Sequence, residues 1–203
     1  MIQRIVIATH NLKKGKEMMT ILSEALPEIE LLTLNDFPPH PEPEETGTTY
    51  EENASIKVLD AARHTGEWCL ADDAGLEIEA IPGELGVFSK RFAGEETSFP
   101  DKMKIILDRM AGLPEGQRAA RFRCLVGLAG PGGEPLHLFE GICPGRISTE
   151  PSGNGGFGYD PIFYLPQLGC TMADLTAEEK HAISHRGKVL AQVIDWIKTY
   201  NTA

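Results

Sequence analysis

The sequence contains no long apolar run, and this absence limits the class of protein. Its apolar stretches fall far short of the roughly 20 residues that a membrane-spanning helix needs. The N-terminal residues, MIQRIVIATHN, are not followed by the small-residue cleavage site of a secretory signal. With 41% hydrophobic and 24% charged residues, the 203-residue chain has the composition of a soluble globular protein. We therefore expect a cytoplasmic protein without a membrane partner.

Paired cysteines and an excess of positive charge are also missing. The cysteines Cys69, Cys124, Cys143 and Cys170 form no CxxC pair, so we expect scattered, mostly buried thiols in a reducing cytosol and no structural zinc. The 30 acidic and 19 basic residues give a formal charge of −11. Such a charge repels nucleic-acid backbones and disfavours a duplex-binding role. It leaves room for a small phosphorylated substrate held by local lysines and a divalent cation.

Apolar periodicity predicts an α/β chain. The β-branched run Arg4–Thr9 predicts a first strand, and the apolar residues after it, at helical spacing, predict a helix that Pro27 ends. Further strands are expected over Glu30–Leu34, Trp68–Asp72, Ala119–Ala129 and Leu136–Cys143, and further helices over Tyr50–Thr65, from Ser98 to about Met110, and through the stripe Val189–Ile197. Since no repeat or linker interrupts this pattern, we expect one α/β domain over residues 1–203.

Two adjacent carboxylates, Asp72 and Asp73, close the predicted strand Trp68–Asp72. Ligands collect at strand ends of open α/β sheets, and one or two carboxylates with substrate phosphates suit Mg²⁺. Glu44 and Glu45 end a segment with four prolines between positions 38 and 43, which predicts a stiff surface loop able to bring a second carboxylate to the same cation. Taken alone, the first pair also fits an Asp-capped turn and the second a solvated acidic loop. Both interpretations stay open.

The residues between the first strand and the first helix suit a phosphate group. Thr9, His10 and Asn11 lead into the helix, and Lys14 follows one turn later. Backbone amides at a helix start attract phosphate, and the lysine adds a full positive charge. The GxxxxGK[ST] pattern of a P-loop is absent. An ordinary helix cap with an exposed lysine explains the segment equally well.

A glycine-rich segment, Gly153–Asp160 (GNGGFGYD), favours a ligand site. Its glycines let the backbone pass close to a flat ligand while Phe157 and Tyr159 stack or pack beside it. The alternative is a wide hairpin whose aromatic rings fill the core. Before the last helix, His185 and Arg186 can donate to a base or a phosphate, or simply form a polar helix junction. The other histidines considered, which lack metal-ligand spacing and are interpreted as surface or packing residues, are His40, His64, His137 and His181.

Together these segments resemble the inosine/xanthosine triphosphate pyrophosphatases. The resemblance rests on six motifs in register from residue 5 to about residue 196: ATxNxxKxxE (Ala8–Glu17), ETGxTYxENAxxK (Glu45–Lys57), ADDAGLE (Ala71–Glu77), GVFSKRFAG (Gly86–Gly94), GGFGYDPIF (Gly155–Phe163) and EEKxxISHRGK (Glu178–Lys188). One such motif is weak evidence, whereas six in order are strong.

The resemblance implies a fold and an activity. The fold is an elongated mixed β-sheet flanked by helices, with two lobes around a central substrate cleft. The activity is Mg²⁺-dependent hydrolysis of non-standard purine nucleoside triphosphates (ITP, dITP, XTP) to the monophosphate and pyrophosphate, which cleanses the nucleotide pool. The resemblance also implies a homodimer with a small-molecule nucleotide substrate.

Carried over residue by residue, the resemblance assigns roles. Asp73 is the catalytic carboxylate, as metal ligand or as the base that orients and deprotonates water, and both roles stay open. Asp72 lies beside it, and Glu44 or Glu45 adds the second acidic contribution. The residues expected to bind substrate are Thr9, His10, Asn11, Lys14, Lys57, Ala74, Phe157, Gly158, Tyr159, Asp160, Lys180, His185 and Arg186. Ala74 departs from the family, which often carries serine there, so a hydroxyl contact to the phosphates is lost.

Two other functions fit parts of the sequence. One is a related pyrophosphatase that acts on pyrimidine or modified nucleotides. The other is a non-catalytic nucleotide-binding or RNA-associated module, against which the acidic charge and the presence of Asp73, Lys14 and Glu45 argue. A pyrophosphate-release assay distinguishes the non-catalytic module from an enzyme. A panel of substrates distinguishes a pyrophosphatase of pyrimidine or modified nucleotides from one of non-standard purine nucleotides.

Overall fold

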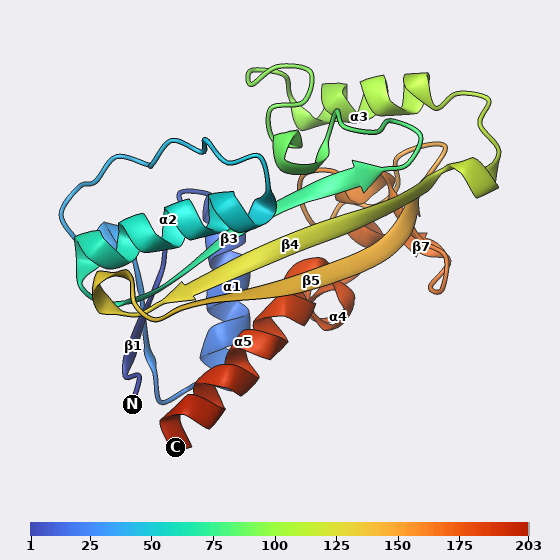
Figure 1. The fold of residues 1–203 in the computed structure, drawn as a ribbon. Coiled ribbons are helices and arrows are strands. Elements are labelled where there is room, and N and C mark those ends of the chain that lie inside the picture. The colour runs from blue at the N-terminus through green and yellow to red at the C-terminus, as the bar shows by residue number, and fades with distance from the viewer. Residues whose placement is uncertain (203) are drawn as a thin grey trace. The chain divides into compact units, whose positions relative to one another are not determined.

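The computed structural model describes residues 1–202 and has one seven-stranded sheet in the order β2-β1-β3-β4-β5-β6-β7 (Figure 1). The strands are β1 (Arg4–Ile7), β2 (Glu30–Thr33), β3 (Trp68–Ile78), β4 (Ala119–Ala129), β5 (Leu136–Ile147), β6 (Phe163–Leu165) and β7 (Cys170–Thr171). The α-helices are α1 (Leu12–Ala25), α2 (Tyr50–Thr65), α3 (Phe99–Arg109), α4 (Ala177–Ile183) and α5 (His185–Thr202). The chain divides into two compact units, and β3, β4 and β5 each pass from one to the other.

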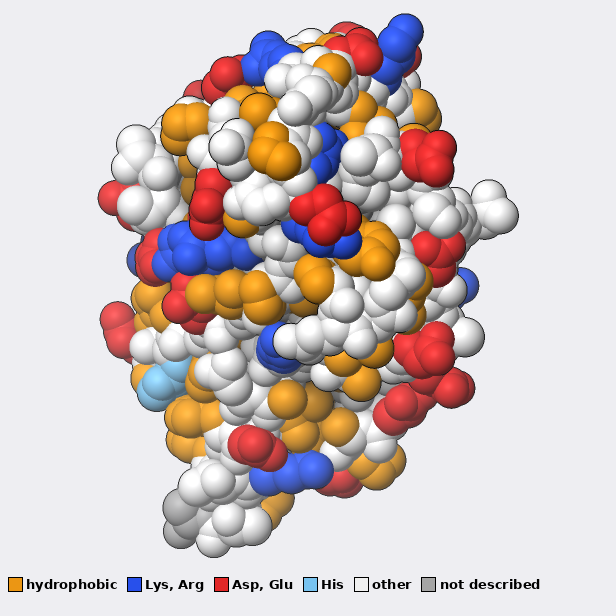
Figure 2. All heavy atoms as spheres, turned by 90° about the vertical axis from the view of Figure 1, so that its right-hand side faces the viewer, with side chains coloured by type: hydrophobic (Ala, Val, Ile, Leu, Met, Phe, Trp, Pro, Cys, Tyr) orange, Lys and Arg blue, Asp and Glu red, His pale blue; other side chains and the backbone are white. Residues whose placement is uncertain are grey.

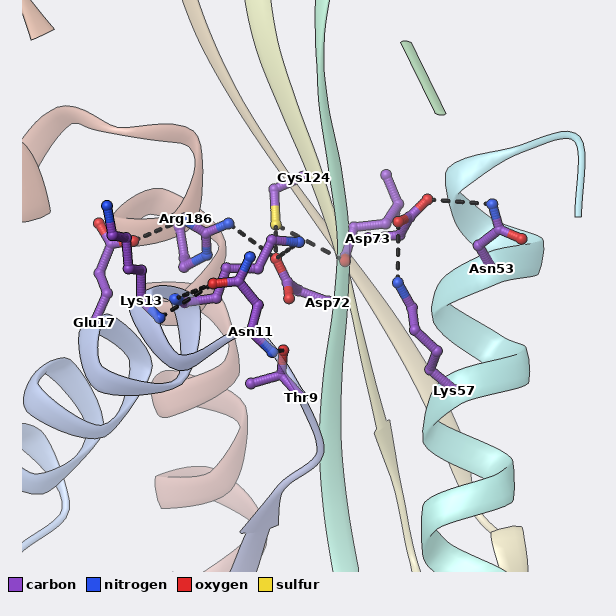
Figure 3. A network of polar contacts seen from close by, with 12 residues as sticks. Thr9, Asn11, Lys13, Glu17, Asn53, Lys57, Asp72, Asp73, Cys124 and Arg186 are labelled. Atoms are coloured by element: carbon purple, nitrogen blue, oxygen red, sulfur yellow. Dashed lines mark hydrogen bonds and ion pairs between the residues drawn. The ribbon is translucent and has the colours of Figure 1, made fainter. Parts of the chain in front are cut away.

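The first unit comprises residues 1–73, 124–141 and 186 onward. In it β1 pairs in parallel with both β2 and β3, and Ile5 stands opposite Leu31 on one side and Trp68 on the other. Helix α2 covers one face of these strands through buried residues such as Val58, while α1 and α5 lie on the other face (Figure 3). At Gly127 a β-carbon would lie 2.7 Å from Val58 Cγ1, so glycine lets α2 approach β4 closely.

The second unit comprises residues 74–123 and 142–185. Its core gathers apolar residues from β3, α3, β4 and β5, among them Leu76, Ile106, Phe122 and Ile147. Strands β5, β6 and β7 are antiparallel neighbours, which makes the sheet mixed. The α/β fold with a mixed sheet is therefore confirmed.

The predicted strand Trp68–Asp72 was too short. β3 continues to Ile78, so Asp72 and Asp73 lie within a strand and not at its end. Gly75 serves a close backbone approach, because a β-carbon there would lie 2.0 Å from the Gly86 carbonyl oxygen. Because glycine has no side chain, β3 can continue past the segment that contains Gly86.

Other boundaries follow the sequence more closely. The helix predicted over Tyr50–Thr65 is confirmed without shift, with the capping box of Thr49 and Glu52 at its start and Gly66 in the left-handed conformation (φ 70°) at its end. β5 runs past the predicted end at Cys143 to Ile147. The last helix starts earlier than its apolar stripe and includes His185 and Arg186, which were placed in a junction.

Surface and core agree with the composition. Cys69, Cys124 and Cys143 are buried, Cys170 is partly buried, and all four thiols are free. On the face drawn in Figure 2, Lys and Arg side chains lie scattered among Asp and Glu and do not gather into one basic surface. Within residues 1–202, no helix combines the length and apolar character needed to cross a bilayer.

Candidate active site

The two carboxylates of the Asp72–Asp73 pair point to opposite faces of β3 (Figure 3). Neighbouring residues of a strand alternate in direction, so two adjacent carboxylates inside a strand serve two different sites. Asp72 faces α1 and α5, whereas Asp73 faces α2. The pair therefore does not act as one cluster.

On the α2 side, Asp73 meets an amide and an ammonium. Its Oδ1 accepts from Lys57 Nζ at 3.0 Å, and its Oδ2 accepts from Asn53 Nδ2 at 3.4 Å. The same ammonium lies 3.1 Å from Glu45 Oε1, so two carboxylates share one lysine. Asn53 and Lys57 are four residues apart on α2 and therefore face the same way.

Burial and charge shift the pKa values of this group. Burial raises the pKa of Asp73 above its ordinary value, although the positive charge of Lys57 opposes the shift. Burial alone would lower the pKa of Lys57, but Asp73, Asp72 and Glu45 raise it. Lys57 therefore stays charged at neutral pH, and Asp73 holds a proton more readily than an exposed aspartate does.

On the other face of β3, Asp72 is enclosed by cations. Its Oδ2 lies 3.0 Å from Arg186 Nη2 and 3.2 Å from Lys14 Nζ, and the Cys124 thiol approaches it at 3.8 Å. Arg186 Nη1 donates to Glu17 Oε2 at 2.7 Å. Burial would raise the pKa of Asp72, but the charges of Lys14, Arg186 and Lys57 hold it well below its usual range.

The start of α1 presents Lys14 toward this network. Asn11 caps the helix, and its Oδ1 accepts from the backbone amides of Lys13 and Lys14, both at 3.1 Å. Thr9 Oγ1 accepts from the Asn11 amide at 3.2 Å. Two of the helix-start amides expected to bind phosphate thus already have a partner, and His10 is exposed beside them.

The proline-rich segment supplies Glu45 but turns Glu44 outward. Glu44 is exposed and its carbonyl oxygen accepts from Thr46 N at 3.0 Å, whereas the Glu45 carboxylate contacts Lys57. Of the two predicted second carboxylates, Glu45 is therefore the one placed beside Asp73 and Lys57.

The donor set near Asp73 suits a hard cation bound together with a substrate. Mg²⁺ takes one or two carboxylates and fills its remaining positions with water and phosphate oxygens. Asp73 and Glu45 provide two carboxylates around one ammonium, while the carboxylate of Asp72 is occupied by Lys14 and Arg186. Among residues 1–202, no group of three or more His, Cys, Asp or Glu side chains is arranged to hold a metal by itself.

In the second unit, Asp160 fixes the glycine-rich loop. Its Oδ2 accepts from the Phe157 backbone amide and from Lys180 Nζ, each at 2.8 Å. The Lys180 ammonium lies 4.3 Å from the centroid of the Phe157 ring. Gly156 has φ 66° and a β-carbon there would lie 2.2 Å from Asp160 Oδ2, so only glycine fits. Phe157 and Gly158 remain partly exposed.

The other predicted nucleoside contacts of this unit are more enclosed. Tyr159 is buried and its hydroxyl donates to the Ser89 carbonyl oxygen at 2.7 Å. His185 is buried and stacks on Phe122, with ring centroids 4.7 Å apart. Ala74, the residue after Asp73 in β3, is half-buried.

Three residues of these networks were not among the site residues predicted from the sequence. They are Glu17 beside Arg186, Asn53 beside Asp73, and Cys124 beside Asp72. Helical spacing offered a signal for Asn53, since it lies one turn before Lys57 in the same motif. No local pattern points to Cys124, because β4 joins β3 only through the tertiary fold.

Comparison with known proteins places these networks in a family context. The model of the Ham1 family matches residues 5–196, a range that contains all six motifs. A dITP/XTP pyrophosphatase of Geobacter sulfurreducens is 45% identical over 192 residues, which cover 95% of each chain. One of Elusimicrobium minutum is 46% identical over 197 residues, covering 96% of this chain and all of that one.

A solved structure agrees with the sequence match. The HAM1 protein of Coxiella burnetii superimposes with a TM-score of 0.87 at 38% identity, and the match covers 98% of this chain and 100% of that one. The family resemblance inferred from the motifs is thereby confirmed, and this chain belongs to the Ham1 family.

Proposed function

We propose that this protein hydrolyses the non-standard purine nucleoside triphosphates dITP, ITP and XTP to the monophosphate and pyrophosphate. The observation that carries the proposal is the pair of carboxylates, Asp73 and Glu45, on the single ammonium of Lys57. The curated relatives are dITP/XTP pyrophosphatases, which supports the substrate class.

The lysines of the first unit suit a triphosphate. The Lys57 ammonium contacts two carboxylates, and Lys14 and Arg186 contact the same carboxylate, that of Asp72. An incoming phosphate can therefore form an ion pair with either lysine beside the carboxylates already there. Transfer of phosphoryl-type groups depends on positioned charge more than on a protein nucleophile. This set of lysines and carboxylates meets that need.

We propose Mg²⁺ as the cofactor, held by Asp73 and Glu45. Bound there, Mg²⁺ neutralises the charge that develops on the phosphate oxygens. Asp72 is left out of this proposed metal site, because its carboxylate is bound by Lys14 and Arg186 on the opposite face of β3.

We propose that the reaction is an attack of water on the α-phosphorus, assisted by Asp73 and the residues around it. A water oxygen forms a bond to the α-phosphorus, the bond from that phosphorus to the bridging oxygen breaks, and pyrophosphate leaves with the bond electrons. We assign to Asp73 the role of orienting the water and taking its proton, which the pKa of this carboxyl group, raised by burial, supports. Asn53 Nδ2 and Lys57 Nζ hold the carboxylate in place.

Base selection is proposed for donors of the second unit. Hypoxanthine and xanthine present a 6-oxo acceptor, whereas adenine presents a 6-amino donor. A donor such as the Lys180 ammonium above Phe157 pairs with the oxygen and leaves the amino group unmatched. We expect kcat/KM for ITP to exceed that for ATP by roughly one to two powers of ten, with ITP and dITP similar.

A pyrophosphate-release assay with dITP, ITP, XTP, ATP and GTP, with and without Mg²⁺, tests the proposal. Monophosphate and pyrophosphate are the expected products, and orthophosphate stays at background without added inorganic pyrophosphatase. Diphosphate and orthophosphate as products contradict attack at the α-phosphorus. Equal kcat/KM for ITP and ATP contradicts base selection, and full activity after chelation contradicts the Mg²⁺ proposal.

Two further expectations accompany the function. We propose a homodimer, which light scattering after size-exclusion chromatography tests through a mass twice that of the chain. We also propose a cytoplasmic location, where such substrates arise, and fractionation of the source cells tests it.

A further inference from the structure

The proline-rich segment lies along one stripe of α2. We name residues 38–47 the strap; it belongs to the connection between β2 and α2 that passes over the helix in Figure 1. Asn53, Lys57, Asp60 and His64 follow one another at helical spacing and so form one face of α2. The strap contacts every one of them, and it runs in the direction opposite to the helix.

The end of the strap nearer to Asp73 is held by the site itself. The Gly47 amide donates to Asn53 Oδ1 at 2.9 Å, and Lys57 Nζ donates to Glu45 Oε1 at 3.1 Å. A β-carbon at Gly47 would lie 2.5 Å from Asn53 Oδ1, so the close approach requires glycine. Asn53 thus touches both the strap and Asp73.

The other end is held by two histidines. The His40 and His64 rings are stacked, with centroids 4.2 Å apart and planes 14° from parallel. His40 Nε2 donates to Asp60 Oδ2 at 2.8 Å, and His64 Nε2 donates to the Pro38 carbonyl oxygen at 3.0 Å. Two hydrogen bonds and one ring stack therefore fasten this end of the strap to the last turns of α2. We name His40, His64 and Asp60 the histidine clamp.

The backbone between the clamp and Glu45 is stiff. Pro41 and Pro43 each fix their own φ angle and so reduce the number of backbone conformations that the segment can adopt. Only four residues separate His40 from Glu45. A stiff segment of this length passes a displacement at one end to the other, so the clamp restricts where the Glu45 carboxylate can lie.

We propose that the histidine clamp is a set of positioning residues that holds Glu45 beside Asp73 and Lys57 for the reaction. This inference rests on the proposed function, because it assigns Glu45 a part in metal and substrate binding. The clamp side chains contact one another and the Pro38 carbonyl oxygen, and they act on Glu45 through the strap. The sequence alone indicated only surface or packing histidines at these positions.

The first measurement reads the strap without using activity. Hydrogen exchange is followed at the Gly47 amide in the parent, in His40→Ala and in His64→Ala. We expect exchange about tenfold faster in both variants, since the bond to Asn53 Oδ1 opens when the strap loses its far anchor. Exchange within β3 and the melting temperature should stay near the parent values, because His40 is exposed, His64 is only partly buried, and neither belongs to the buried core. His181→Ala on α4 is the control and should change neither quantity.

The second measurement reads the consequence for the reaction. In both variants the Mg²⁺ concentration that gives half the maximal rate with dITP should rise about tenfold. His64→Phe keeps a ring for the stack but lacks the donor to the Pro38 carbonyl oxygen, so it should fall between parent and His64→Ala. Since the two rings share one contact, the double alanine variant should lose less than the product of the single losses.

The outcomes separate this inference from the proposed function. A parent without activity on dITP and XTP removes the proposed function, while the exchange measurement still decides whether the clamp holds the strap. An active parent with unchanged Gly47 exchange, or with faster exchange and an unchanged Mg²⁺ requirement, overturns the positioning role. So does faster exchange throughout β3 with a lower melting temperature, because the histidines are then a general stability element.

Discussion

The polar networks of the two units are organised differently. In the first unit, charges are shared: Lys57 serves two carboxylates, and Asp72 serves two cations. In the second unit, Asp160 and Lys180 form a buried pair that also fixes a backbone amide. Shared charges can change partners when a phosphate and a cation arrive, whereas a closed pair keeps a loop in one shape. The first arrangement suits reaction, and the second suits recognition.

The same contrast appears within the first unit, on the two faces of β3. Burial raises the pKa of Asp73 while the cations around Asp72 hold its pKa well below the usual range. A carboxylate with a raised pKa carries a cost in the folded state, and one with a lowered pKa contributes to stability. The proposed catalytic role of Asp73 and the structural role of Asp72 thus fall on adjacent residues of one strand, and mutations at the two positions should separate activity from stability.

The largest effect on activity is expected from Asp73→Asn. The change removes the proposed base and metal ligand, so kcat for dITP should fall at least a hundredfold. The melting temperature should not fall, because the asparagine removes a charge whose burial is unfavourable at neutral pH. Steady-state kinetics and thermal unfolding measure the two quantities. Asp108→Asn, at an exposed position of α3, is the control, and a kcat within a few-fold of the parent contradicts the assigned role.

Asp72→Asn should have the largest effect on stability. The substitution removes the buried negative charge that pairs with Lys14 and Arg186. The free energy of unfolding should therefore fall by about 3 kcal/mol at pH 7. Because the folded-state pKa of Asp72 is lowered, its contribution is complete above about pH 4 and is lost as the pH falls below that value.

Denaturant unfolding of Asp72→Asn and of the parent between pH 3 and 7 tests the sign. The difference in unfolding free energy should be constant at the neutral end and shrink at the acidic end. A difference that grows on acidification, or an Asp72→Asn protein as stable as Asp73→Asn, removes the distinction between the two faces of β3.

A smaller and more selective effect is expected from Asp160→Asn. The amide oxygen still accepts from the Phe157 backbone amide, but the charge opposite Lys180 is gone. We expect KM for dITP to rise about tenfold while kcat stays within a few-fold, since recognition is weakened and the reacting groups are untouched. Asp195→Asn, exposed on α5, serves as the matched control. A loss confined to kcat would place this pair in the chemistry instead.

Local signals predicted the elements well and the contacts less well. The capping box at Thr49 and the glycine after Thr65 define α2, because each acts on neighbouring residues. The length of β3 depended on the close approach of Gly86 to Gly75, and the opposite faces of Asp72 and Asp73 followed from that length.

The candidate site divides in the same way. Motifs within one segment, such as Lys57 with its helix or Lys14 with its cap, were recognised from the sequence. The bond between Arg186 and Glu17 joins residues at opposite ends of the chain, and the stack of His40 on His64 depends on the path of the strap. Such contacts are products of tertiary structure, which no local pattern encodes.

The smallest effect is expected from Ala74→Ser, which restores the residue that the family often carries. Ala74 follows Asp73 in β3, so its side chain points to the face of β3 opposite to that of Asp73, and we expect a hydroxyl there to meet the phosphates from that side. One added hydrogen bond to a phosphate oxygen contributes about 1 kcal/mol, which corresponds to a few-fold lower KM for dITP. Because Ala74 is half-buried, the small hydroxyl should fit with an unchanged melting temperature. Ala74→Val adds volume without a donor and should raise KM, so the pair separates hydrogen bonding from packing. A serine variant with unchanged KM would mean that the backbone at this position already supplies what the phosphates need.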